Sequence, residues 1–275
     1  HDEHADHGAP HGWRRWVYAT NHKDIGTMYL LFAFAMFMVG GILALGIRVE
    51  LFHPGLQFIN PQLFNQLTTM HGLIMVFGAI MPAFVGFANW MIPMMIGAPD
   101  MAFARMNNWS FWLLPPAAIL LFSGFLLEDG AAQAGWTAYS PLARNLGTGM
   151  DLWILAVLML GVSSTIGAAN FLVTLFRMRA PGMTMFRLPI FTWTMLVVSF
   201  MILIAFPVIT AALFMLLADR RLDAHFGGRL VRSAADADPI AVVQVGHELR
   251  ARRIALVATD GLDPVVRRDA LHAIL

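Results

Sequence analysis

The stretch QLTTMHGLIMVFGAIMPAFVGFANWMIPMMIG, residues 66–97, contains one imidazole and no acidic, lysine or arginine side chain. A helix needs about 20 mostly apolar residues to cross the hydrocarbon core of a bilayer. This stretch is long enough, and four others resemble it, at about residues 26–47, 109–127, 150–176 and 190–217. The sequence therefore predicts an all-α protein, a polytopic transmembrane bundle of five helices.

Composition also indicates a membrane protein. Hydrophobic residues make up 58% of the 275 residues and charged residues only 13%, whereas soluble domains average about 45–50% and about 25%. The mean hydropathy is +0.65. Residues 218–275 differ from the rest, because they hold nine of the eighteen Lys and Arg residues and no apolar run of spanning length. We therefore expect a membrane bundle over residues 1–217 and an unrelated polar tail over residues 218–275.

Charges on the predicted loops indicate the orientation of the bundle, because short cytoplasmic loops carry an excess of Lys and Arg. If the amino terminus is cytoplasmic, the basic residues on that side are Arg14, Arg15, Lys23, Arg105, Arg177, Arg179 and Arg187. The opposite side then receives Arg48 and Arg144 together with four acidic residues. We therefore expect a cytoplasmic amino terminus and, after five crossings, a tail on the outer side.

The amino-terminal residues HDEHADHGAPHG hold four of the ten histidines. Histidine-rich tracts can bind metal, but a flexible polar arm is the simpler interpretation. The sequence begins with His1 rather than Met and shows no signal peptide, so we expect a processed or incomplete terminus. Cysteine is absent, which excludes disulfides and thiolate metal ligands.

His71 is the only histidine inside a predicted span. Helices rise about 1.5 Å per residue, so its position near the start of the second span places it in the outer part of the bilayer. One interpretation is a neutral imidazole that is hydrogen-bonded to a neighbouring helix. The other is a proton relay or a cofactor ligand, because a neutral imidazole suits iron. The residues alone leave both interpretations open.

A second group of polar residues lies toward the cytoplasmic ends of the spans. It comprises Asn89, Asp100, Asn107, Asn108, Ser163, Ser164, Asn170 and Thr174. Ser163, Asn170 and Thr174 share one helical face, because they are seven and four residues apart. Such residues form hydrogen bonds between helices or cap helix ends. They can also line a chain of water molecules that begins at a carboxylate and carries protons.

Five segments resemble subunit I of cytochrome c oxidase, a member of the haem-copper oxidase superfamily. They are TNHKDIGTMYLLF (20–32), TTMHG (68–72), MIGAPDMAFARMNNWSFWLLPP (95–116), GWTAYSPL (135–142) and MRAPGMTMFRLPIFTW (178–193). The resemblance runs from about Trp13 to Arg220 and covers the amino-terminal half of the family pattern. The combination of APDMAF with MNN is highly specific and favours the cytochrome c branch over the quinol branch.

The resemblance implies roles for three residues near the outer side. His71 matches an axial ligand of the low-spin haem a, and Arg48 matches an arginine that contacts the formyl group of this haem. Trp136 matches a tryptophan beside a propionate of the second haem. The complete enzyme also contains haem a3 and a copper ion, reduces oxygen to water with electrons from cytochrome c, and pumps protons.

The resemblance also implies a proton pathway from the inner side. Asp100 matches the carboxylate at its mouth, and the polar groups along it match Asn89, Asn107, Ser163, Ser164 and Asn170. The implied partners are other oxidase subunits, cytochrome c and the lipid bilayer, with no nucleic acid. The implied location is an energy-transducing membrane, the bacterial inner membrane, with the amino terminus in the cytoplasm.

The sequence departs from the family pattern in two ways. Ala104 and Ala88 replace a usual proline and a common glycine, which are small changes. Beyond Arg220, the family's haem-copper ligands and later pathway residues are not found, and the tail histidines His225, His247 and His272 do not replace them. We therefore expect a truncated chain that is inactive alone. The alternatives are quinol oxidase subunit I, a non-catalytic membrane fragment, and a proton-coupled transporter, which internal repeats and broken helices would favour.

Overall fold

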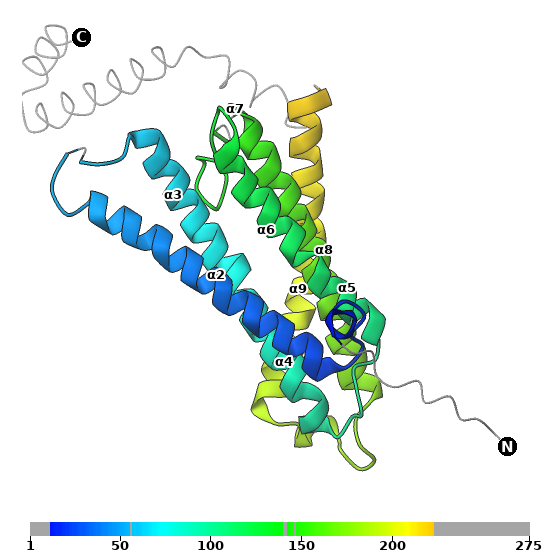
Figure 1. Cartoon of the computed structure of the whole chain (residues 1–275). Helices are drawn as coiled ribbons and strands as arrows, with labels where there is room; N and C mark the ends of the chain where they lie inside the picture. The colour runs from blue at the N-terminus through cyan, green and yellow to red at the C-terminus, as the bar shows by residue number, and fades with distance from the viewer. Residues whose placement is uncertain (1–11, 56, 140–141, 146, 223–275) are drawn as a thin grey trace, which may run out of the picture. The chain divides into compact units, whose positions relative to one another are not determined.

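The computed structural model describes residues 12–55, 57–139, 142–145 and 147–222 (Figure 1). Within these ranges the chain forms helices and no strand. Five helical stretches are long and apolar enough to cross a membrane: His22–Glu50, Pro61–Ile96, Ala104–Leu126, Thr148–Arg177 and Ile190–Leu222. The all-α class and the five predicted spans are therefore confirmed.

Several predictions concern residues outside the described ranges. These are the histidine-rich start, residues 1–11, and the polar tail beyond Leu222 with His225, His247 and His272. The first five residues of the predicted tail belong to the last helix, α9 (Ile190–Leu222), which ends five residues after the predicted boundary at 217. Arg220 is therefore a helical residue.

Polar caps explain why the first two spans begin before their predicted limits. Helix α2 (His22–Glu50) starts after Asn21, whose side chain accepts a 2.8 Å hydrogen bond from the backbone N–H of Lys23. Helix α3 (Pro61–Leu73) starts after Asn60, which caps Leu63 in the same way. Such caps satisfy N–H groups that a helix leaves free at its start. Hydropathy does not detect these polar turns.

A short helix, α1 (Trp13–Val17), precedes α2 and is tied to it by an ion pair. The guanidinium group of Arg15 lies 2.7 Å from the carboxylate of Asp24. This hydrogen bond and the negative charge of Asp24 raise the pKa of Arg15 above its usual value. Because Arg15 is more than half exposed, the pair orients α1 and adds little stability.

The second span combines three helical segments: α3, the π-helix η1 (Ile74–Ile80) and α4 (Met81–Ile96). The backbone N–H of Met81 donates to Val76, five residues back. This wide turn lies directly before Pro82, which has no N–H to offer to the preceding turn. π-Helical turns inside α-helices are frequent at functional sites. Here the turn begins three residues after His71.

The third span is interrupted as well. It consists of α5 (Ala104–Trp112), α6 (Leu114–Ser123) and the 3₁₀ turn η2 (Gly124–Leu126). The interruption at Leu113 lies where Pro115 and Pro116 lack the N–H groups that would donate to the carbonyl oxygens of Phe111 and Trp112. A short helix, α7 (Leu142–Asn145), leads into the long helix α8 (Thr148–Arg177).

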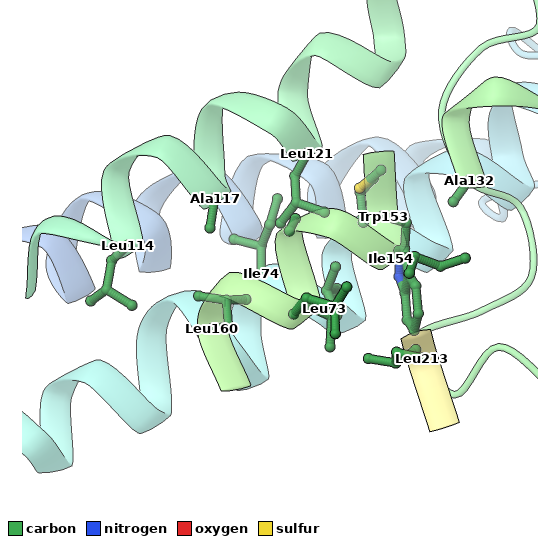
Figure 2. Packing of buried hydrophobic residues seen from close by; sticks show 14 of the residues in the cluster. Leu73, Ile74, Leu114, Ala117, Leu121, Ala132, Trp153, Ile154, Leu160 and Leu213 are labelled. Atoms are coloured by element: carbon green, nitrogen blue, oxygen red, sulfur yellow. The ribbon is translucent and has the colours of Figure 1, made fainter. Parts of the chain in front are cut away.

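Helix α8 is the centre of the packing. It contacts α9, α6 and α5, and α2 contacts α3, η1 and α4 (Figure 1). In the apolar 18-residue stretch of each helix, 56% of the residues of α8 are buried, whereas only 11% of those of α2 and 6% of those of α9 are buried. Figure 2 shows the apolar core that joins the helices, where Leu114, Leu121 and Leu160 lie near Ile74. Most of the outer surface of α2 and α9 remains uncovered.

The two glycines Gly26 and Gly86 bring α2 and α4 into close contact. A β-carbon on Gly26 would lie 2.9 Å from the carbonyl oxygen of Gly86 and 2.7 Å from Cδ1 of Trp90. Small residues at such crossings let membrane helices approach closely. The crossing fixes the amino-terminal part of α2 against the middle of α4.

Candidate functional site

His71 is oriented by a single hydrogen bond. Its Nδ1 atom lies 2.9 Å from the carbonyl oxygen of Gly40 on α2. A carbonyl only accepts, so Nδ1 carries the proton, and in the neutral ring Nε2 keeps a lone pair. Among the described residues, no hydrogen bond reaches Nε2. A histidine that binds a metal through one ring nitrogen usually donates from the other to a carbonyl or carboxylate, as His71 does to Gly40.

Trp136 lies beside the helical turn that carries His71. The backbone N–H of Gly135 donates to Oγ1 of Thr69 at 3.0 Å, which attaches this loop to α3. A β-carbon on Gly72 would lie 3.0 Å from Cδ1 of Trp136, so the ring packs tightly against this glycine. The Trp136 side chain is 47% exposed. The structure thus brings Trp136 and the His71 turn together.

Arg48 is not joined to His71 in the described part of the chain. It lies on α2 eight residues after Gly40, about 12 Å farther along the helix axis. Its side chain is exposed, and no hydrogen bond or ion pair connects it to another described residue. Arg48 lies toward the same end of the bundle as His71. Because its side chain is exposed and has no partner among the described residues, it is available to a group bound beside α2.

At the opposite end, Asp100 follows α4 and is partly buried. Its Oδ1 atom accepts hydrogen bonds from the backbone N–H groups of His22, at 3.1 Å, and Met101, at 2.7 Å. Asn89 is fully buried one to two turns before the end of α4. Its side-chain oxygen accepts a hydrogen bond from Nδ2 of Asn107. Asp100, Asn89 and Asn107 therefore gather between α2, α4 and α5.

Asn170 binds the loop between α4 and α5 from the neighbouring helix α8. Its Oδ1 atom accepts a 2.8 Å hydrogen bond from the backbone N–H of Phe103. Thr174, one turn later, accepts from the backbone N–H of Ala102 at 3.0 Å. Part of the polar stripe on α8 thus has a structural role, as the alternative of hydrogen bonding between elements predicts.

Oδ1 of Asn108 on α5 is buried without a protein partner. So are two further amide atoms of this region, Oδ1 of Asn107 and Nδ2 of Asn170. Both residues have no exposed surface. Buried polar atoms are nearly always hydrogen-bonded, to protein or to ordered water. One acceptor and one donor left open in this way support bound water between α5 and α8.

Farther into the bundle, Ser163 joins a network of hydroxyl groups. Its Oγ donates to the carbonyl oxygen of Ser110 at 2.6 Å, and Oγ of Ser110 donates to the carbonyl oxygen of Asn107 at 2.7 Å. The hydroxyl of Tyr29 lies 2.8 Å from Oγ of Ser110. Ser163, Ser164 and Tyr29 also line a mostly apolar cavity of about 450 Å³ between α4, α8 and α9. Polar groups thus continue from Asp100 to the cavity.

Sequence reasoning missed Tyr29, Ser110 and His22. Ser110 follows Asn107 by three residues, which is a helical spacing that could have included it in the polar group. Tyr29 and His22 lie on α2, which the sequence linked only to Arg48, and their contacts join residues 81 and 67 positions apart. Such pairs depend on tertiary packing and have no local signal.

Comparison with known proteins identifies the family. A family model described as "Cytochrome C and Quinol oxidase polypeptide I" matches residues 24–243, so the match extends beyond Arg220, where the resemblance was expected to end. "Probable cytochrome c oxidase subunit 1-alpha" of Streptomyces coelicolor is 50% identical over 214 residues, which are 77% of this chain and 37% of that protein. "Probable cytochrome c oxidase subunit 1-beta" of Nocardia farcinica is 49% identical over 215 residues, with the same coverage.

The chain thus spans little more than a third of the length of these relatives. The matched region contains nearly all of the five membrane-spanning helices, together with His71, Trp136 and the polar residues between α4, α5 and α8. The chain is a multi-pass membrane protein, and it belongs to the family of cytochrome c and quinol oxidase polypeptide I.

Proposed function

We propose that this chain forms the amino-terminal part of subunit I of a cytochrome c oxidase and that His71 would bind the iron of haem a. The observation that carries this proposal is the hydrogen bond from Nδ1 of His71 to Gly40, which leaves the lone pair of Nε2 without a protein partner in the described chain. This donor fits iron, which accepts a neutral imidazole. A haem would supply one-electron transfer there.

The neighbouring residues have supporting roles in this proposal. Gly40 fixes the plane of the imidazole, and Trp136 covers the same turn of α3 through its contact with Gly72. Arg48 offers a positive charge without a partner among the described residues. A cation near a redox group stabilises its reduced form and raises its potential.

Oxygen reduction belongs to the complete protein in this proposal. There, cytochrome c supplies electrons from outside, haem a3 and copper form the oxygen-reducing centre, and other oxidase subunits complete the assembly. The names of the relatives support cytochrome c rather than quinol as the donor. The chain would lie in the bacterial inner membrane with its amino terminus in the cytoplasm. The bundle would end with α9 at Leu222, and a separate polar tail would follow it.

The second half of the proposal concerns protons. Asp100 would collect protons at the inner end, and Asn89, Asn107, Asn170, Ser163 and Ser164 would hold the water that carries them inward. The contacts between Asn89 and Asn107, the two open amide atoms and the hydroxyl network support this order. Protons move along hydrogen-bonded groups, and a carboxylate attracts them from solution.

The haem assignment can be tested on the purified chain. A reduced-minus-oxidised spectrum of the chain expressed with haem a should show bound haem, and His71→Ala should remove this absorption. His53→Ala is the matched control, because His53 is an exposed histidine of the outer loop and its loss should leave the spectrum unchanged. Haem absorption that persists in His71→Ala would reject the assignment.

A further inference from the structure

We propose that His22 is a positioning residue of the proton entrance: its ring holds a carbonyl group of α4 that Pro93 deprives of its usual backbone donor, and its backbone N–H holds Asp100. The inference rests on the proposed proton function and adds to it the residue that fixes the relative position of Asp100 and Asn89.

Pro93 deprives one carbonyl of α4 of its usual partner. In an α-helix, a carbonyl oxygen accepts from the backbone N–H four residues later, and proline has no N–H. Pro93 lies inside α4, so the carbonyl oxygen of Asn89 loses this donor. Asn89 has no exposed surface. Leaving a buried carbonyl unpaired is costly, above all inside a membrane.

The imidazole of His22 supplies the missing donor. Its Nδ1 atom lies 2.8 Å from the carbonyl oxygen of Asn89, 67 residues away in the sequence. The acceptor is a carbonyl, so Nδ1 carries the proton. The side chain is only 5% exposed, which keeps water from replacing it. The close crossing of α2 and α4 at Gly26, one turn beyond His22, brings the ring within reach.

The same residue also contacts the proposed proton collector. His22 is the first residue of α2, where the backbone N–H groups have no partner within the helix. Its N–H donates to Oδ1 of Asp100 at 3.1 Å. Asn89 in turn accepts from Asn107. His22 is thus attached to the carboxylate at the mouth and to the first buried amide of the path, and it sets their separation.

The replacement of the missing backbone donor by the His22 ring is testable on the full chain in lipid nanodiscs. His22→Phe keeps a ring but removes the donor, and it should lower the melting temperature by about 5 °C, as expected for one buried unpaired carbonyl. Pro93→Ala restores the backbone N–H to Asn89, so His22→Phe should cost at most half as much in that background. An equal loss in both backgrounds overturns the inference.

His22→Asn is the matched variant, because its side-chain N–H can replace that of Nδ1. It should keep the melting temperature of the unsubstituted chain to within about 2 °C. If His22→Phe is too unstable to purify alone, its comparison with His22→Asn is made in the Pro93→Ala background, where the two should melt together. A large difference in melting temperature between His22→Phe and His22→Asn in the Pro93→Ala background would contradict the inference that the His22 ring replaces the missing backbone donor.

The positioning role needs a functional readout, for which residues 12–222 replace the matching part of the Streptomyces coelicolor relative in an intact oxidase. In this chimeric oxidase, His22→Phe should slow proton uptake about tenfold, the loss that one unpaired buried group can cause. Reduction of haem a by cytochrome c should keep its rate, because His71 lies at the other end of the bundle. Pro93→Ala should restore proton uptake.

Asp100→Asn in the same oxidase separates the two proposals. If Asp100→Asn keeps full proton uptake, the proposed proton function fails. If Asp100→Asn slows uptake but His22→Phe does not, the proposed function stands and the inference about His22 is overturned. Slowing by His22→Phe that Pro93→Ala does not relieve also overturns it, because the effect would not pass through the carbonyl of Asn89.

Discussion

At the scale of single residues, Asp100 is held on one side only. Both of its hydrogen bonds arrive at Oδ1, from backbone N–H groups, and Oδ2 has no donor among the described residues. An asparagine in its place would keep the accepting oxygen and lose the negative charge. The position therefore permits a substitution that separates the charge of Asp100 from its structural contacts.

We predict that Asp100→Asn leaves assembly intact and removes function. In the chimeric oxidase, both haems should bind in the usual ratio, because the contacts to His22 and Met101 remain. Turnover and proton pumping should fall at least about tenfold, because a neutral amide does not collect protons. The measurements are oxygen consumption and acidification by vesicles containing the enzyme. Unchanged turnover and pumping would reduce Asp100 to a capping residue.

The sequence anticipated residues whose chemistry contrasts with their surroundings. His71 is conspicuous because it lies in an apolar span, and Asp100, Asn89 and Asn107 because amides and carboxylates are rare there. His22 was missed, because it precedes the predicted span 26–47 and acquires its role only from Pro93. Its partners lie 67 and 78 residues away, and no local pattern encodes such a pairing.

At the scale of elements, the amino-terminal end of α8 and the carboxy-terminal end of α9 are joined by a buried ion pair. Arg220 of α9 and Asp151 of α8 bond to each other, and their side chains are 6% and 8% exposed. Arg220 also donates to the carbonyl oxygens of Ala143 and Gly147, at 2.8 and 2.9 Å. Arg221 bonds to the same carboxylate but is 55% exposed. One arginine is therefore enclosed by its partners and the other faces outward.

We predict that the two arginines differ strongly in their contribution to stability. Arg220→Ala leaves Asp151 buried with one exposed partner and removes a donor from the carbonyl oxygens of Ala143 and Gly147, so it should destabilise the chain by about 3 kcal/mol. Arg221→Ala removes an exposed partner and should cost about 1 kcal/mol or less. Thermal unfolding of the purified chain in lipid measures both. Equal losses would show that burial does not distinguish the two contacts.

This ion pair also marks the limit of hydropathy as a guide to elements. The five spans were predictable from apolar length alone, yet the end of α9 was expected at 217, before the charged residues. Arg220 continues the helix because its charge is compensated by Asp151 and by the carbonyl oxygens of Ala143 and Gly147. The wide turn before Pro82 and the interruption before Pro115 follow from proline chemistry, and hydropathy does not detect them.

At the scale of the whole molecule, the described bundle leaves most of the apolar surface of α2 and α9 uncovered by other helices. In the apolar 18-residue stretches of α2 and α9, only 11% and 6% of the residues are buried. The chain spans 37% of the length of its Streptomyces coelicolor relative. In a membrane, lipid covers apolar helix surfaces of this kind. In the proposed complete subunit, the remaining helices would cover part of them. The helices that carry His71 and the polar path are packed on each other, which keeps both groups in place within the part described.

The orientation of the bundle in the membrane is the last prediction. Basic residues gather on the loops that share a side with the amino terminus, so this side should be cytoplasmic. Two exposed positions test it: Leu126, 87% exposed at the outer end of the third span, and Phe186, 92% exposed between α8 and α9. The sequence contains no cysteine, so each substitution creates a unique label. A membrane-impermeant maleimide should label Leu126→Cys on intact spheroplasts, and Phe186→Cys only after permeabilisation, because the two positions lie at opposite ends of the spans. The reverse pattern would invert the topology, put Asp100 outside and withdraw its role as a collector of cytoplasmic protons.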